Sequence, residues 1–421
     1  MADADFEAMG PAVDAVSEPR LARAAGRAWL TVTLCCLAGM AEGYDIQSMG
    51  VAAPGMAPAL HLARDQLGPA FSASTVGLLF GAMLVGWLAD HVGRKASLVG
   101  SLAVFGAFTL ATPFASSLPM LLAIRTLAGL GLGGAMPNFI ALASESVSEQ
   151  RRATFVAIAG AAMPFGGGIA SGVAAAFDWR MIFDIGGAWP LALAALMIAA
   201  LPESQRFLEA RHRRAAEGAR APGPMLALFG EGRALPSLLL WTACFAALLT
   251  LFLLLNWLPI LMATKGVSKP DASIVSLAFN LAGAGGALSV AALFRGHRRA
   301  PIVAMWFAGM TVGTLLLGMT PARLELAAAA ACVAGFFISS VAIALYAIAP
   351  DFYAVEMRGT GLGATIGVGR GGGVVGPLAA GALLAAGADA SGVLMVLPLV
   401  VAVGAAAALW LVRLRPRTPV A

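Results

Sequence analysis

Four ionisable residues lie inside long apolar stretches of this 421-residue sequence, namely Glu42, Asp45, Arg125 and Arg370. Glu42 and Asp45 are spaced i, i+3, so a helix would place both carboxylates on one face. A charge in an apolar layer is costly, and such residues usually pair with one another or act on protons, ions and charged substrates. These four residues are therefore the predicted site of proton exchange and anion binding.

The positions of these residues along their helices predict which charges meet. Counted at ~1.5 Å per residue from the ends of the apolar runs, Arg125 reaches a depth close to that of Asp45, and Glu42 lies near the middle. A carboxylate opposite a guanidinium makes both charges tolerable there, and such a pair could serve only to fix helix packing. Two carboxylates against one arginine leave an imbalance that a proton or a substrate could resolve, so a functional pair is the favoured interpretation.

Arg370 has no acidic residue at a similar depth in its own half of the chain. Asp351, Glu356 and Asp389 all fall at the ends of apolar runs or in loops. An unpaired arginine in a cavity wall favours an organic anion as its partner, held bidentately if the anion is a carboxylate. The alternative is that Arg370 pairs with an acid of the first half or with backbone carbonyl groups.

Four neutral polar residues add candidate substrate contacts. Asn138, Asn256, Asn280 and Tyr346 fall in or near the apolar runs. Each of them is equally well explained as a hydrogen-bonding contact between helices.

The composition describes a chain whose solvent is lipid. Hydrophobic residues make up 60% of the sequence, charged residues only 12%, and the mean hydropathy is +0.86. These values exclude a soluble enzyme, a disordered chain and a nucleic-acid-binding module.

The apolar runs predict an all-α integral membrane protein. Twelve runs reach the ~20 residues that a membrane-spanning helix needs, and they form two sets of six. The predicted halves are 28–203 and 237–414, with a disordered tail at 1–27, a polar linker at 204–236 and a second tail at 415–421. The predicted spans are 28–52, 71–91, 96–117, 120–142, 152–176, 182–203, 237–262, 272–295, 300–321, 326–350, 360–385 and 392–414.

The distribution of basic residues predicts the orientation in the membrane. Twenty of the 27 Lys and Arg residues fall in the segments that share one side with the N-terminus, and five fall in the loops of the opposite side. Because basic residues concentrate in cytoplasmic loops, both termini and the linker are expected in the cytoplasm, as in a multi-pass protein of the inner membrane. The net charge of +5 is then an orientation signal, and no nucleic-acid partner is expected.

The two halves repeat a local pattern. The run that starts Glu149-Gln-Arg-Arg matches the run that starts Glu356-Met-Arg-Gly, at an offset of 207 residues. Both runs enter a helix that is rich in glycine and proline. Two pseudo-symmetric six-helix halves can rock against each other around a central site.

Two motifs resemble signatures of the major facilitator superfamily. The run Gly86-x3-Asp90-x2-Gly93-Arg94-Lys95 resembles the signature loop between its helices 2 and 3. The run from Arg125 through Gly129, Gly131 and Gly133 resembles its helix 4 signature. The resemblance implies the major facilitator fold, a transporter in place of an enzyme, and an inner gate built on Gly86, Asp90, Gly93 and Arg94.

The gate loop of the second half departs from that signature. It reads Arg295-Gly-His-Arg-Arg299 and lacks the acidic residue. The inner gate is therefore expected to be asymmetric and to rest mainly on Asp90.

Finer motifs are similar to the aromatic acid:proton symporters of that superfamily. They include Pro202-Glu203-Ser204, Asn256-Trp-Leu-Pro259 and Arg358-Gly-Thr-Gly. Glu42 stands where that branch usually has an aspartate, and this change, with Tyr346, is similar to the members that take up 3-(3-hydroxyphenyl)propionate.

This resemblance implies import of an aromatic carboxylate with a proton. The roles it implies are proton and substrate groups for Glu42 and Asp45, and a partner for them in Arg125. A monomer in the bilayer is expected, with the proton as coupling ion and without a cofactor or metal.

Two other functions stay open. A proton-coupled exporter of drugs or metabolites would use the same fold, although Pro164-Phe-Gly-Gly-Gly stands where antiporters carry Gly-Pro-x-x-Gly-Gly. A membrane ligand sensor or a polytopic enzyme is the other alternative, but the predicted cytoplasmic loops contain no cluster of metal-binding residues.

Overall fold

The computed structural model describes residues 18–145, 149–203, 228–293, 299–353 and 358–414, and within them it is helical throughout apart from turns. Three short 3-10 helices, η1 (Thr112–Phe114), η2 (Gly230–Gly232) and η3 (Ala349–Phe352), accompany twelve long helices. The long helices are α1 (Glu18–Ala59), α2 (Arg64–Val92), α3 (Arg94–Ala111), α4 (Leu118–Glu145), α5 (Glu149–Ala176), α6 (Trp179–Ala200), α9 (Ala234–Thr264), α10 (Lys269–Leu293), α11 (Arg299–Met319), α12 (Leu324–Ile348), α13 (Arg358–Ala385) and α14 (Ala390–Arg413).

The predicted all-α membrane fold of twelve helices is confirmed. In the described part of the chain, ten of the helices are long and apolar enough to cross a membrane, and α1 and α5 are the other two. A helix that carries two buried carboxylates, as α1 does, is less apolar for that reason.

Helix α1 starts earlier than expected, at Glu18, inside the segment 1–27 that was predicted to be a tail. Pro19 suits the first turn of a helix, and the following Leu, Ala and Arg residues are good helix formers. The rest of that tail, most of the linker and the final tail lie outside the described residues.

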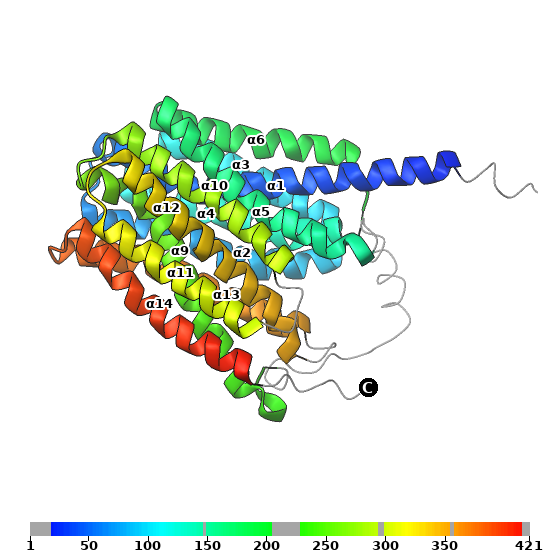
Figure 1. Ribbon diagram of the computed structural model, residues 1–421. Helices are drawn as coiled ribbons and strands as arrows, with labels where there is room; N and C mark the ends of the chain where they lie inside the picture. The colour runs from blue at the N-terminus through cyan, green and yellow to red at the C-terminus, as the bar shows by residue number, and fades with distance from the viewer. Residues whose placement is uncertain (1–17, 146–148, 204–227, 294–298, 354–357, 415–421) are drawn as a thin grey trace, which may run out of the picture.

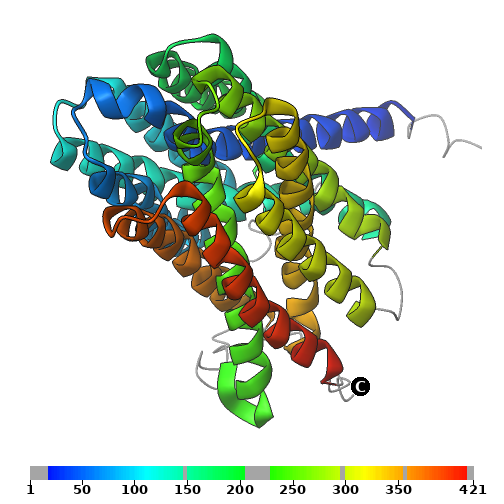
Figure 2. The same ribbon diagram turned by 60° about the vertical axis from the view of Figure 1, so that its left-hand side comes forward.

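The two halves have matching packing partners. In the first half α1 packs on α5 and α6, α2 packs on α4, and α3 packs on α4 and α6. In the second half α9 packs on α13 and α14, α10 packs on α12, and α11 packs on α12 and α14. The same arrangement is therefore built twice, as the sequence repeat predicts, and the two bundles lie beside each other in Figure 2.

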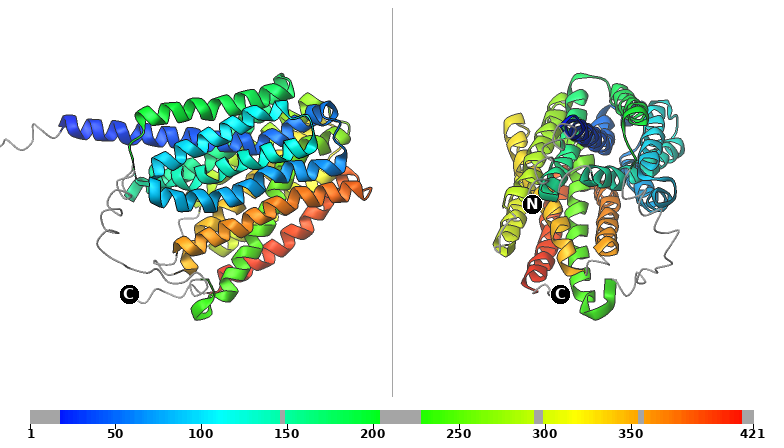
Figure 3. Two further views of the ribbon diagram at one scale, coloured as in Figure 1. Left: turned by 180° about the vertical axis from the view of Figure 1, so that it is seen from behind. Right: turned by 90° about the vertical axis from the view of Figure 1, so that its right-hand side faces the viewer.

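The halves meet through α2 on α13, α5 on α10, and α1 on α9. The C-terminal ends of α6 and α14 lie toward one end of the bundle in Figure 1, here called the linker end, and the opposite end is called the distal end. Helices α6 and α14 separate toward the linker end, and the view from behind in Figure 3 shows the same divergence.

Glycine allows α2 and α4 of the first half to cross closely. A Cβ atom at Gly77 on α2 would overlap the carbonyl oxygen of Thr126, and one at Gly129 on α4 would overlap that of Ser74. Such contacts between backbones are typical of membrane helices that carry small residues at their interface.

Lys265 links the end of α9 to the end of α11 at the distal end of the second half. Its Nζ donates hydrogen bonds to the carbonyl oxygens of Leu317, Gly318 and Thr320, at 2.9, 2.8 and 3.0 Å. These groups close α11, where unpaired carbonyls attract a cation. Burial lowers the pKa of the Lys265 ammonium, and the nearby charge of Asp389 opposes that shift.

Replacement of Lys265 by methionine is expected to lower the free energy of unfolding by about 1–2 kcal/mol, because three carbonyl groups lose their donor. Thermal unfolding of the purified protein in detergent measures the loss. Lys269→Met removes an exposed ammonium at the start of α10 and serves as the control. Equal melting temperatures for the two variants would contradict this role of Lys265.

Candidate functional site

Asp45 and Arg125 form a buried, bidentate ion pair in the first half. Arg125 Nη1 donates to Asp45 Oδ1 at 3.1 Å, and Nη2 donates to Oδ2 at 2.8 Å. The Thr109 hydroxyl on α3 donates a third hydrogen bond to Oδ1 at 2.7 Å. Asp45 is 0% exposed and Arg125 is 1% exposed. The structure thus brings together the two residues whose depths match, and it holds the Asp45 carboxylate through three donors.

Glu42 and Arg370 form a looser pair that joins the two halves. Arg370 Nη2 lies 3.6 Å from Glu42 Oε1, beyond hydrogen-bonding distance, and 3.0 Å from the sulfur of Met136. Glu42 is 0% exposed, and neither of its carboxylate oxygens has a hydrogen-bond partner. Arg370 Nη1 also lacks a partner.

The favoured expectation for Arg370, an arginine without an acidic partner, is therefore wrong. Its side chain reaches from α13 to the first-half acid Glu42. A search for acids within each half misses this pair, because it exists only when the halves are packed together. Polar atoms of both residues make no hydrogen bond, so the pair can bind a further ligand.

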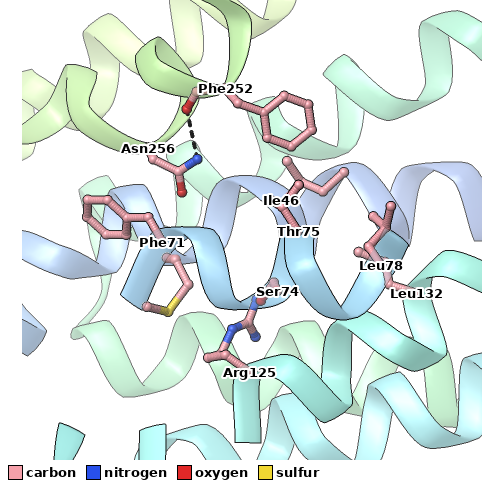
Figure 4. Close-up of a pocket in the computed structure, with 10 residues that line it drawn as sticks. Ile46, Phe71, Ser74, Thr75, Leu78, Arg125, Leu132, Phe252 and Asn256 are labelled. Atoms are coloured by element: carbon pink, nitrogen blue, oxygen red, sulfur yellow. Dashed lines mark hydrogen bonds between the residues drawn. The ribbon is translucent and has the colours of Figure 1, made fainter. Parts of the chain in front are cut away.

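A pocket lies beside the Asp45–Arg125 pair. It is small, and its enclosed space of about 10 Å³ holds roughly one water molecule. Helices α1, α2 and α4 of the first half and α9 of the second half supply its walls. Its lining residues are Ile46, Met49, Phe71, Ser74, Thr75, Leu78, Arg125, Leu132, Phe252 and Asn256, most of them labelled in Figure 4.

The three predicted asparagines are all buried, and each donates to a carbonyl of its own helix. Asn138 Nδ2 donates to Gly134 O, and Asn256 Nδ2 donates to Phe252 O, both at 2.8 Å. Asn256 lines the pocket and Asn138 does not. Tyr346 on α12 is half-buried and lies close enough to Arg370 to interact with it electrostatically.

Gln47 is a buried residue that the sequence analysis missed. Asn280 Nδ2 of α10 donates to Gln47 Oε1 at 3.0 Å, and Gln47 Nε2 donates to the Leu255 carbonyl of α9 at 2.9 Å. Gln47 is 1% exposed. Gln47 lies two residues after Asp45, and a polar residue at that place in an apolar run could have marked it as a candidate. A search restricted to ionisable residues passes over it.

The residues of the predicted inner gate lie where α2 ends and α3 begins. Gly93 joins the two helices with φ 102°, a conformation that glycine adopts readily, and Arg94 starts α3. Glu203 Oε1 accepts hydrogen bonds from the backbone N–H groups of Arg94 and Lys95, at 2.9 and 3.0 Å. Gly86 and Asp90 belong to α2, but the side chain of Asp90 lies outside the described part, so the gate remains a prediction.

The second-half gate segment 294–298 also lies outside the described residues. Next to it, Arg299 forms an ion pair with Asp351 of η3.

Comparison with known proteins gives the family. The model of the Major Facilitator Superfamily matches residues 35–322. The chain belongs to the major facilitator superfamily. It is therefore a transporter in the membrane and not an enzyme.

This major facilitator protein has several curated relatives. It is 40% identical to a "3-(3-hydroxy-phenyl)propionate transporter" of Escherichia coli strain K12, over 87% of this chain and 90% of the relative. It is 31% identical to "4-hydroxybenzoate transporter PcaK" of Pseudomonas putida, over 85% of this chain and 87% of the relative. A "Gallate transporter" of Pseudomonas putida is 32% identical over 85% of this chain and 86% of the relative.

Solved structures confirm the major facilitator fold. A crystal structure of a D-xylose-proton symporter superimposes with a TM-score of 0.73 at 17% identity, covering 90% of this chain and 96% of the other. At this identity the likeness concerns the fold alone.

Proposed function

We propose that this protein imports an aromatic carboxylate together with one proton by alternating access. The relatives named above transport hydroxylated aromatic acids, according to their names. The observation that carries the proposal is the Glu42–Arg370 pair, in which a buried carboxylate and a buried guanidinium both retain unused hydrogen-bonding atoms.

The charges of the site favour one proton for each substrate. Asp45 with Arg125, and Glu42 with Arg370, are two neutral pairs. An incoming carboxylate adds one negative charge in a low-dielectric site, and a single proton cancels it. Import of an uncompensated anion against an inside-negative potential would cost about 2.3 kcal/mol per 100 mV.

Glu42 is the carboxylate that we assign as the proton carrier. Protonation of Asp45 would weaken three hydrogen bonds and leave Arg125 without its counter-charge. Protonation of Glu42 breaks no hydrogen bond, because its oxygens accept none. Protonated Glu42 also releases Arg370, whose planar guanidinium can then bind the substrate carboxylate bidentately.

Contacts between the halves support alternating access from the distal side. Ser72 Oγ on α2 donates to the Val374 carbonyl on α13 at 2.9 Å, and Gln47 joins α1 to α9 and α10 as described above. These bonds lie in the distal half of their helices, so they would break when that end opens. The basic-residue count assigns the linker end to the cytoplasm of a bacterial cell, and the site is complete within one chain, which favours a functional monomer.

Gly50→Ala is expected to slow uptake about tenfold. A Cβ atom at Gly50 on α1 would overlap the Leu255 carbonyl oxygen and lie 2.7 Å from Asn256 Cα, so the distal contact would not close fully. Overpacking of this kind costs about 1–3 kcal/mol. Gly172→Ala on α5, where no atom lies within 4 Å of the new methyl, is the control. Initial uptake rates in proteoliposomes compare the two, and equal rates would contradict distal closure at Gly50.

Uptake into proteoliposomes with an imposed pH gradient tests the proposed function. A panel of labelled aromatic acids, with a weakly basic drug as a counterflow substrate, is added outside. Accumulation of an aromatic acid only when the outside is more acidic is the expected result. A flat response across the acids, or proton antiport of the drug, would overturn the proposal.

A further inference from the structure

We propose that two side chains of α2, Leu79 and Met83, dock onto two glycines of α13, Gly367 and Gly363, when the linker end of the protein closes. This inference rests on the proposed function, because it assigns the contact that alternating access requires at the linker end.

Helices α2 and α13 pack against each other at the distal end. Ser72 Oγ donates to the Val374 carbonyl, and a Cβ atom at Gly68 would lie 3.3 Å from Leu378 Cα. The first contact lies four residues further along α2 and four residues earlier along α13 than the second, so the helices run antiparallel in one register. In the left view of Figure 3 the two helices separate toward the linker end.

The face of α13 that packs on α2 is bare toward the linker end. Gly367 and Gly363 precede Val374 by seven and eleven residues, about two and three helical turns, so they lie on its face. A Cβ atom at either glycine would meet no atom within 4 Å. Arg370 lies on the same face and reaches Glu42, so this face is turned toward the first half.

Leu79 and Met83 occupy the matching positions on α2. They follow Ser72 by seven and eleven residues, so they lie on its face, about two and three turns nearer to the linker end. Continuation of the distal register places Leu79 opposite Gly367 and Met83 opposite Gly363. Met83 is 75% exposed and Leu79 is half-buried, so both have surface that a partner can cover.

A large apolar side chain opposite a glycine suits a contact that forms and breaks in lipid. Membrane helices associate through close packing, and a small residue on one helix lets the other approach. The unbranched side chain of Met83 can adapt to the surface that Gly363 offers. The distal contact at Ser72 and this contact involve the same two helices, so rocking that opens one would close the other. The linker-end contact would then replace the packing that is lost at the distal end.

Disulfide trapping tests whether the two faces meet. The variant Met83→Cys/Gly363→Cys in proteoliposomes is oxidised with copper phenanthroline, and mass spectrometry of the digested protein measures the disulfide. A disulfide requires Cα atoms about 4.4–6.8 Å apart, so it reports direct contact of these positions. The control variant Leu84→Cys/Gly363→Cys should give about a tenth of that disulfide, because Leu84, also exposed, lies about 100° further around α2.

An exchange of side chains tests the fit itself. Gly363→Met should slow counterflow of an aromatic acid about tenfold, because two methionines would overpack the closed contact. The double variant Met83→Gly/Gly363→Met moves the methionine to the other helix and should recover the rate to within about threefold of the wild type. Gly100→Met adds the same side chain at an exposed glycine of α3, where no atom lies within 4 Å, and should behave as the wild type.

The outcomes separate this contact from the proposed function. A wild type that exchanges an aromatic acid, with no more disulfide at positions 83 and 363 than in the Leu84 control, would overturn the contact. A folded double variant as slow as Gly363→Met would also overturn it. If the disulfide forms but a pH gradient drives no accumulation by the wild type, the proton-coupled function fails and the contact stands. Absence of both exchange and disulfide would overturn both.

Discussion

Replacing Glu42 with glutamine is expected to abolish accumulation of aromatic acid driven by a pH gradient, while exchange of external for internal substrate continues. Glutamine has nearly the shape of a protonated glutamate, so Arg370 stays available to the substrate, but the side chain cannot release a proton. A neutral one-proton symport accumulates substrate about tenfold per pH unit at equilibrium. Glu42→Gln should therefore bring the internal concentration only to the external one.

Two assays on the same proteoliposomes measure this effect. Net accumulation under a one-unit gradient reports coupling, and counterflow without a gradient reports binding and transit. Glu325→Gln makes the same change at an exposed position in the first turn of α12 and should behave as wild type. Full accumulation by Glu42→Gln would show that the proton is carried elsewhere.

Arg125→Ala is expected to lower the free energy of unfolding by about 3–5 kcal/mol, because it leaves the Asp45 carboxylate charged, buried and without two of its three donors. The double variant Asp45→Asn/Arg125→Gln removes both charges and should recover much of that loss. Denaturation of the purified protein in detergent gives these values, and Arg64→Ala, an exposed arginine at the start of α2, is the control.

The stability and uptake of these variants distinguish the role of Asp45 from that of Glu42. Asp45→Asn should also abolish uptake, but together with a loss of stability, since it leaves Arg125 uncompensated in the core. Glu42→Gln should retain the wild-type melting temperature, because Glu42 accepts no hydrogen bond. A double variant as unstable as Arg125→Ala would contradict the ion-pair explanation.

The fold was predictable from the sequence because lipid imposes strong rules. A spanning helix needs a long apolar run, so the bounds of the nine helices from α4 onward could be marked within about three residues, whereas the end of α1, the start of α2 and the end of α3 were missed by six or seven. The repeat around Glu149 and Glu356 indicated the two halves. The early start of α1 was missed, since nothing apolar marks a helix that extends beyond the membrane.

The site was predictable only in part. The depths of Asp45 and Arg125 along their helices were enough to predict their ion pair, because the two residues lie on neighbouring helices of one half. Depth alone could not predict the contact between Glu42 and Arg370, because that contact depends on how the two halves pack together. Thr109 and Ser74 resemble many small polar residues at membrane helix interfaces, and only the structure shows that one holds Asp45 and the other faces a pocket.

Proton uptake on substrate binding tests the central claim most directly, namely that Glu42 takes up a proton from solution when a substrate carboxylate binds to Arg370. Purified protein in weakly buffered detergent solution at mildly alkaline pH is mixed with an aromatic acid, and a pH indicator counts the protons taken up per bound substrate. The account predicts about one proton for the wild type, since one anion enters a neutral site, and none for Glu42→Gln with substrate still bound. Substrate binding by the wild type without proton uptake, or equal uptake by Glu42→Gln, would contradict it.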